Sequence, residues 1–254
     1  MRLLPDAVWK GLLRTPPLRF LRDRLVGPSD TEHLASGPIR FERLAFEFVA
    51  PYAIWNKART RGIENRICRV IMTRARPGSV AIDVGANCGF LTLIMGFSVG
   101  EAGRVLSFEP DAGYFDVLGR NVRANDFEGR CQLYRAKVGR SVEEGMVTLD
   151  AIAEERGITS VDLVKIDVDG PDYDVLLGAR RLLERARPTV IIEMSARQDA
   201  IYALLKEELG YTYCVGMSGE PVVPGQWPLN IIAADTPIVI PARGALSGEQ
   251  VSRA

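Results

Sequence analysis

Two segments determine the architecture of this sequence: Val80-Ala-Ile-Asp-Val-Gly-Ala-Asn-Cys-Gly-Phe90 and Arg104-Val-Leu-Ser-Phe-Glu109. The first predicts a buried strand that runs into a tight glycine turn and then into the start of a helix. The second predicts another buried strand that ends in a carboxylate. In open α/β sheets this combination holds a cofactor that contains adenosine, because the turn allows close approach and the carboxylate accepts hydrogen bonds from both ribose hydroxyls.

The glycine pattern distinguishes between two such cofactors. A dinucleotide site requires G-x-G-x-x-G, whereas here Gly85 and Gly89 flank Asn87 and no third glycine completes the motif. Asp83 would repel a pyrophosphate, and it suits the cationic amino acid end of S-adenosylmethionine. Glu109 follows Gly85 by 24 positions, about the separation expected of a ribose-binding acid. We interpret these five residues as cofactor-binding; the alternative is that Asp83 caps a helix and Glu109 is a solvated strand end.

The composition fits one α/β domain of enzyme size. The chain has 254 residues, of which 47% are hydrophobic and 25% are charged, enough to bury a sizeable core. Its formal net charge is zero, which argues against a nucleic-acid partner. The four cysteines are widely spaced without a metal-ligand pattern, as in a reduced cytoplasmic protein. No apolar run has the length of a membrane span, and the N-terminus lacks the apolar core of a signal peptide.

The first 40 residues differ in character from the rest. Residues 1–26 hold six basic and two acidic residues, with apolar side chains at helical spacing that Pro16-Pro17 interrupts. We expect a helical segment that caps the domain; the alternative is a surface segment that contacts an anionic membrane or lies over the substrate. The expected division is an N-terminal helical and linker segment over 1–40, one domain over 41–240 and a disordered tail over 241–254.

From residue 80 onward the pattern alternates strands and helices, as in a doubly wound sheet. Residues 41–76, before it, are expected to be mostly helical. The expected strands are 80–84, 105–108, 131–134, 161–166, 190–192, 211–215 and 229–233. The expected helices are 90–99, 113–125, 151–155, 174–183 and 200–209.

With these elements placed, the chain resembles the FkbM family of S-adenosylmethionine-dependent methyltransferases over about residues 60–235. The motifs that carry the resemblance are Asp83-Val-Gly-Ala-Asn-Cys-Gly89, Phe108-Glu-Pro110, Asn121 and Asn125, Thr148-Leu-Asp150, Val161-Asp-Leu-Val-Lys-Ile-Asp-Val-Asp-Gly170 and Ile192-Glu193. The resemblance implies a Rossmann-like, seven-stranded class I methyltransferase sheet whose last strand is antiparallel. It also implies methyl transfer, most often to a hydroxyl oxygen of a sugar, polyketide or related small molecule.

Two features depart from the family pattern. The segment from Val138 to Val147, between the third strand and the Thr-Leu-Asp motif, is shorter than usual in the family. The fourth strand ends in Asp167-Val-Asp169-Gly170 where family members usually read Asp-x-Glu-Gly, so the second carboxylate loses one methylene. These departures support the alternative function, a non-catalytic or degenerate protein of the same fold that binds the cofactor without turnover.

Methyl transfer to oxygen requires an acceptor oxygen held in line with the methyl group and a group that takes up its proton. Asp167 and Asp169 end the fourth strand on one side of the extended chain, so we interpret them as the catalytic pair, one of them acting as base. Together with Glu193 they would alternatively bind a divalent cation such as magnesium. The structural alternative is that Asp167 contacts the cofactor's amino group, Asp169 caps the next helix and Glu193 only supports the fold. The single histidine, His33, is expected at the surface; to act as the catalytic base it would require the N-terminal segment to fold over the site.

Two further residues have open interpretations. Lys165, within the fourth strand, is either a buried partner of a carboxylate or exposed at a sheet edge. Glu64 matches a glutamate often found at this place in the family, and a helix-surface acid is the equal alternative. The nature of the oligomer is open as well.

Other functions fit the motifs less well. An amino-group methyltransferase of DNA would carry an Asn/Asp-Pro-Pro-aromatic run after the fourth strand, which is missing here. A nicotinamide dehydrogenase is disfavoured by the glycine spacing and by the lack of a Tyr-x-x-x-Lys pair. The expected partner is therefore a hydroxylated small molecule.

Overall fold

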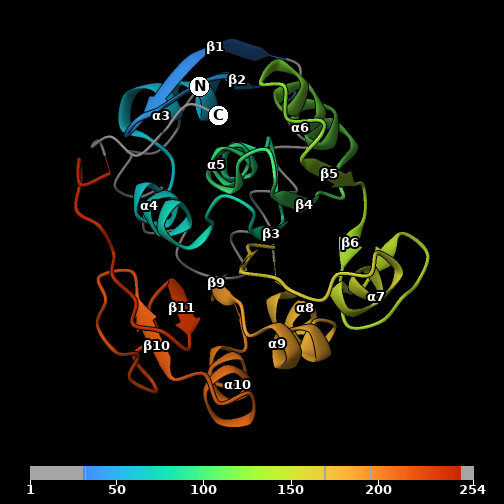
Figure 1. Ribbon diagram of the computed structural model, residues 1–254, viewed down its shortest axis with the longest axis vertical. Coiled ribbons are helices and arrows are strands. Elements are labelled where there is room, and N and C mark those ends of the chain that lie inside the picture. The colour runs from blue at the N-terminus through green and yellow to red at the C-terminus, as the bar shows by residue number, and fades with distance from the viewer. Residues whose placement is uncertain (1–30, 32, 169, 195, 247–254) are drawn as a thin grey trace, which may run out of the picture.

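The computed structural model describes residue 31 and residues 33–168, 170–194 and 196–246 (Figure 1). The expected helical segment over residues 1–26 and the last eight residues of the expected tail therefore lie outside the described residues. So does Asp169, one member of the expected catalytic pair.

A seven-stranded sheet forms the centre of the molecule, in the order β10-β11-β9-β8-β3-β4-β5. The strands β9, β8, β3, β4 and β5 are parallel, and β11 is antiparallel to both of its neighbours. This topology confirms the predicted class I methyltransferase sheet with its last strand antiparallel. The strand bounds are β3 Val80–Val84, β4 Arg104–Phe108, β5 Cys131–Tyr134, β8 Leu163–Ile166, β9 Thr189–Glu193, β10 Tyr213–Gly216 and β11 Asn230–Ala234.

Helices cover both faces of the sheet. Side chains alternate along each strand, so each strand presents apolar side chains to both helical layers. On β3, Ala81 is buried against one helical layer, and Ile82 and Val84 are buried against the other. The first layer contains α3 (Tyr52–Arg61), α4 (Asn65–Arg74), α5 (Phe90–Val99) and α6 (Ala112–Ala124). The second contains α7 (Leu149–Glu155), α8 (Asp172–Leu177), α9 (Arg180–Ala186) and α10 (Gln198–Tyr202), which a π-helical segment continues over Ala203–Glu208.

A β-hairpin precedes the sheet, so the helical expectation is wrong for the first part of residues 41–76. Strand β1 (Leu34–Phe41) pairs antiparallel with β2 (Leu44–Pro51), and helix begins only at α3. Phe46, Phe48 and Ala50 are buried in alternation along β2, which is the period of a strand and not of a helix. The boundary expected at residue 40 falls within β1.

Helix α6 lies beside β2, and two asparagines of this helix bind the backbone of the strand as a neighbouring strand would (Figure 1). Asn121 Nδ2 donates to the Val49 carbonyl at 2.7 Å, and Asn121 Oδ1 accepts from the Val49 N–H at 2.6 Å. Asn125, one helical turn later, makes the same pair of bonds with Glu47 at 2.8 and 3.0 Å. Asn121 is fully buried and also donates to the Cys88 carbonyl at 2.6 Å. It therefore joins the hairpin to the glycine turn.

Three smaller features complete the fold. The helix expected at 174–183 is divided into α8 and α9 at Gly178, where a Cβ would lie 1.9 Å from the Gly139 carbonyl oxygen. The shortened segment around Gly139 forms a two-residue parallel pair, β6 (Lys137–Val138) with β7 (Met146–Val147). Residues 241–246 of the expected tail lie against the first helical layer, since Arg69 Nε donates to the Pro241 carbonyl at 2.8 Å. Among the described residues, no helix has both the length and the apolar character to cross a membrane.

Replacing Asn121 with alanine is expected to lower the free energy of unfolding by about 2–4 kcal/mol, because it leaves buried backbone groups of Val49 and Cys88 without partners. Urea unfolding followed by circular dichroism measures the loss. Asn125→Ala is the matched control: Asn125 is only half-buried, so water replaces its bonds and a loss below about 1 kcal/mol is expected. Equal losses in the two variants would contradict the role assigned to the buried amide.

Candidate active site

The glycine turn between β3 and α5 approaches the end of β8 so closely that no side chain fits. Gly85 has φ +82°, and a Cβ at this position would lie 1.9 Å from the carbonyl oxygen of Asp167. The N–H groups of Gly85 and Ala86 both donate to the Phe108 carbonyl at 3.0 Å, which ties the turn to β4. Both the backbone conformation and the contact therefore require glycine here.

Asn87 and Gly89 complete the turn in left-handed backbone conformations. Asn87 has φ +52°, and its Oδ1 accepts from the Cys88 N–H at 2.7 Å, a local bond that suits asparagine to this conformation. Gly89 has φ +85°, and a Cβ there would lie 2.5 Å from Leu118 Cδ1 on α6. The turn is therefore a backbone cradle fixed by α6 on one side and by β4 and β8 on the other.

Glu109 closes the cradle from the end of β4. The residue is 7% exposed; its Oε2 accepts from the Asn87 N–H and its Oε1 from the Asp111 N–H, both at 2.8 Å. Burial raises the pKa of the Glu109 carboxyl, and the two N–H bonds oppose the rise. Each carboxylate oxygen keeps a second lone pair, so Glu109 can still accept hydrogen bonds from a ligand.

Asp83 lies buried beneath the turn, with 1% exposure. Its Oδ2 accepts from the Thr92 hydroxyl at 2.6 Å, and Thr92 Oγ1 also lies 3.0 Å from Ser107 Oγ. Its Oδ1 has no hydrogen-bond partner in the part of the chain that the structure describes. Burial raises the pKa of the Asp83 carboxyl, while Lys165 and Thr92 lower it. A buried carboxylate oxygen without a donor marks a place where a ligand's donor would be stabilising.

Lys165 is the buried cation around which the carboxylates gather. It lies in register with Asp83 on the neighbouring strand, so both side chains leave the same face of the sheet. Its Nζ donates to Asp167 Oδ2 at 2.6 Å. Burial acts against the Lys165 charge, but Asp167, Glu64 and Asp83 outweigh it and raise the pKa of the ammonium. Of the two interpretations of Lys165, the buried partner of a carboxylate is confirmed and the exposed position is wrong.

Glu64 stands at the rim of this cluster, immediately before α4. Its backbone is left-handed, with φ 47° and ψ 43°. Desolvation raises the pKa of the Glu64 carboxyl, and Lys165 lowers it. The negative charges of Asp167 and Asp83 add to the rise. Because the residue as a whole is exposed, water screens these effects and Glu64 belongs to the rim of the site, not to its core.

The expected catalytic carboxylates occupy the carboxyl edge of the sheet. Asp167 follows β8 directly, with 29% of its side chain exposed, and Lys165 stabilises its ionised form. Glu193 ends β9 on the neighbouring strand. Asp169 lies outside the described residues, so the catalytic pair stays a prediction. Among the residues that are described, no three His, Cys, Asp or Glu side chains are grouped to hold a metal ion.

The structure thus brings together six of the residues that the sequence pointed to: Asp83, Gly85, Asn87, Gly89, Glu109 and Asp167. Sequence reasoning missed the central place of Lys165 and the hydroxyls of Thr92 and Ser107. The signal for Lys165 was a charged residue inside an apolar strand, which is costly unless it is paired. His33 is exposed just before β1, as expected.

The chain is similar to several known proteins in sequence or in structure. A family model for the methyltransferase FkbM domain matches residues 134–213, about a third of the chain. A methyltransferase FkbM from Methylobacillus flagellatus KT is similar in structure, with a TM-score of 0.45 and 20% identity, over 62% of this chain and 44% of that one. A SAM-dependent O-methyltransferase from Thermotoga maritima has a TM-score of 0.46 and 18% identity, over 78% and 77% of the two chains. A putative O-methyltransferase from Klebsiella pneumoniae has a TM-score of 0.51 and 16% identity, over 85% and 94%. No curated protein matches the chain.

The likeness to the Klebsiella protein shows the fold of the chain, and the family model matches about a third of its length. The match to the methyltransferase FkbM model over residues 134–213 confirms the resemblance seen in the motifs. The match includes Thr148-Leu-Asp150 and the strand-four motif, and the glycine turn precedes it in the chain. The chain spans less than half of the Methylobacillus protein.

Replacing Lys165 with methionine is expected to cost about 3 kcal/mol or more of unfolding free energy at pH 7, because buried carboxylates lose their cation. The deficit should shrink as the pH falls to about 4. Burial already holds the pKa of Asp83 above its unfolded value, and the loss of Lys165 raises it further. Protonated Asp83 is tolerated below that pKa, whereas ionised Asp83 destabilises the fold above it.

Urea unfolding of wild type and variant between about pH 4 and pH 8 measures this dependence. Lys137→Met, at an exposed position, is the control and should show a small difference that does not change with pH. A deficit of Lys165→Met that is constant across the pH range would refute the electrostatic role of Lys165.

Proposed function

We propose that this protein is an S-adenosylmethionine-dependent methyltransferase that transfers a methyl group to a hydroxyl oxygen of a small molecule, such as a sugar or polyketide. The observation that carries the proposal is the convergence of Asp83, the glycine turn and Glu109 on one cradle, at the carboxyl ends of β3 and β4. Ligands of open α/β sheets bind outside these strand ends. S-adenosylmethionine would supply the methyl group on a sulfonium, whose sulfur leaves as a neutral thioether.

Two features of the cradle support this cofactor. The free lone pairs of Glu109 suit the two ribose hydroxyls, because a carboxylate that already binds two N–H groups is fixed in orientation. Asp83 and Asp167 lie at the ammonium of Lys165, and Glu64 adds a third carboxylate at the rim. The excess of negative charge and the Oδ1 of Asp83 without a donor suit the cationic amino acid end of the cofactor.

The chain's own part in the reaction is to hold the acceptor and to take up its proton. In this proposal Asp167 accepts the proton of the acceptor hydroxyl while the oxygen forms its bond to the methyl carbon and the carbon–sulfur bond breaks. The position of Asp167 supports this role, since it is partly exposed beside the cradle and Lys165 favours its ionised form. Asp169 is proposed as the second member of the pair. A magnesium ion held by Asp167, Asp169 and Glu193 is the alternative way to acidify the hydroxyl.

Calorimetric titration with S-adenosylhomocysteine, the product form of the cofactor, tests the first part of the proposal. We expect micromolar binding by the wild type and a loss of at least about 100-fold in Glu109→Ala, because two hydrogen bonds to a charged group are removed. Glu128→Ala, which removes an exposed acid, should bind like the wild type. A folded wild-type protein that does not bind would end the cofactor proposal.

Asp167→Asn tests the second part. Hydroxylated sugars and polyketides are screened, with and without magnesium, for acceptor-dependent formation of S-adenosylhomocysteine. The variant is expected to lower kcat by about 100-fold or more, as for loss of a general base, and to affect S-adenosylhomocysteine affinity far less than Glu109→Ala does. Turnover that requires magnesium would favour the metal alternative. Tight binding by the wild type without any turnover would favour the non-catalytic alternative.

A further inference from the structure

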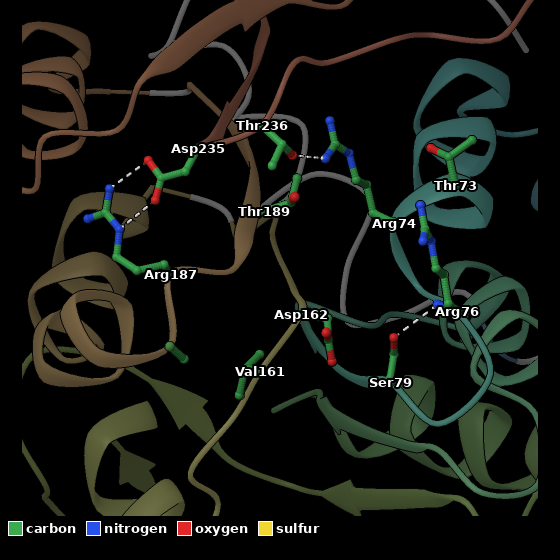
Figure 2. A pocket seen from close by; sticks show the side chains of 11 residues that line it. Thr73, Arg74, Arg76, Ser79, Val161, Asp162, Arg187, Thr189, Asp235 and Thr236 are labelled. Atoms are coloured by element: carbon green, nitrogen blue, oxygen red, sulfur yellow. Dashed lines mark hydrogen bonds and ion pairs between the residues drawn. The ribbon is translucent and has the colours of Figure 1, made fainter.

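A pocket lies at the opposite edge of the sheet from the candidate active site. Its volume is about 310 Å³, and it opens where β3, β8 and β9 begin and where β11 ends (Figure 2). Three arginines, two aspartates and four residues with hydroxyl groups line it. A pocket of this size and polarity accommodates a small, charged ligand.

One arginine of the pocket is already neutralised. Arg187 forms a two-pronged ion pair with Asp235, with Nε to Oδ2 at 2.7 Å and Nη2 to Oδ1 at 2.8 Å. It also donates to the Leu209 carbonyl and lies 4.3 Å from the ring centre of Tyr211. Asp235 raises the pKa of Arg187, and Arg187 lowers the pKa of Asp235. This pair forms one wall of the pocket. Its two charges neutralise each other, so it does not attract a charged ligand.

The other two arginines lack such a partner. Figure 2 shows Arg74 and Arg76 on the same side of the pocket, across from the Arg187–Asp235 pair. Arg74 donates to Thr236 Oγ1 at 2.5 Å and to the Pro237 carbonyl at 2.6 Å, and both acceptors are uncharged. Within the described ranges, no carboxylate lies within 4.0 Å of Arg74 or Arg76. Burial lowers the pKa of Arg74, and the charge of Arg76 lowers it further.

The surroundings fix the guanidinium of Arg74 and the backbone of Arg76. The Arg76 N–H donates to Ser79 Oγ at 3.0 Å and the Ser79 N–H to the Arg76 carbonyl at 2.8 Å, so the turn between α4 and β3 is closed. The Thr236 hydroxyl accepts from Arg74 and keeps its own proton for a ligand. Asp162 faces the same pocket, where its Oδ2 accepts from the Val80 N–H at 2.9 Å. An anion near the arginines would thus have an acceptor for donor groups beside it.

From this geometry we infer that the pocket binds a small phosphorylated molecule, with its phosphate on Arg74 and Arg76 and its hydroxyl groups toward Asp162. A phosphate dianion matches two guanidinium groups in charge, and its several oxygens accept from both of them and from Thr236. The hydroxyl groups of the ligand donate to Asp162, which rejects a second anionic group. The site is independent of the proposed methyl transfer, since it shares no residue with the active site.

Calorimetric titration of the full chain with inorganic phosphate and with glycerol 3-phosphate tests this inference, in the presence of saturating S-adenosylhomocysteine to occupy the other edge of the sheet. We expect glycerol 3-phosphate to bind more tightly than inorganic phosphate, and both to bind more tightly than acetate. Arg76→Gln should weaken both by about tenfold or more, as for loss of a charge-assisted hydrogen bond. Arg104→Gln, an exposed arginine at the start of β4, is the matched control and should change nothing.

Asp162→Asn provides a test of opposite sign. Asparagine keeps an acceptor for the Val80 N–H and removes the negative charge, so inorganic phosphate should bind several-fold more tightly. No phosphate binding in the millimolar range, equal affinity for acetate, or equal weakening by Arg76→Gln and Arg104→Gln would overturn the inference. If S-adenosylhomocysteine itself does not bind, the proposed methyl transfer fails while the phosphate titrations still decide the pocket.

Discussion

The contact of Gly85 with the carbonyl of Asp167 is the constraint on which the candidate site depends. With only a hydrogen at this Cα, the turn after β3 can lie against the end of β8. Asp83 then stands beside Lys165, Lys165 reaches Asp167, and Glu109 reaches the Asn87 N–H. A larger residue would separate the two strand ends and, with them, the carboxylates from their shared cation.

The hairpin belongs to this arrangement although it is remote in sequence. Asn121 binds the backbone of β2 and the carbonyl of Cys88 with one side chain, and the rings of Phe46 and Phe48 lie 5.6 and 5.3 Å from Phe90 at the start of α5. A polar contact and an aromatic cluster thus connect β2 to the end of the turn where α5 begins. Helix α5 is packed between the sheet and the hairpin, since it contacts β3 and β4 on one side and β2 on the other.

Local patterns account for what the sequence could predict. The strand, turn and helix around Gly85 and the acid 24 positions later are local signals, and they located the cradle. The position of Lys165 opposite Asp83 depends on the register of two strands, in which the paired residues are 82 positions apart, and no local pattern encodes it. The hairpin was missed because the buried alternation in each strand is short, Ile39 and Phe41 in β1 and Phe46 to Ala50 in β2, and a helix follows directly. The amides of Asn121 and Asn125 find their partners only once that hairpin exists.

The two ends of the parallel strands differ in charge, a difference that the net charge of zero conceals. Arg74 and Arg76 stand near the point where β3 begins, and the carboxylates of Asp83, Asp167 and Glu109 stand where β3, β8 and β4 end. These two groups of charges therefore define an electric dipole along the strands. Such a field orients charged ligands during diffusional approach, cations toward one edge and anions toward the other. Because screening at physiological salt confines it to about 8 Å, the orientation acts in the last step of encounter, when a ligand already lies near the surface.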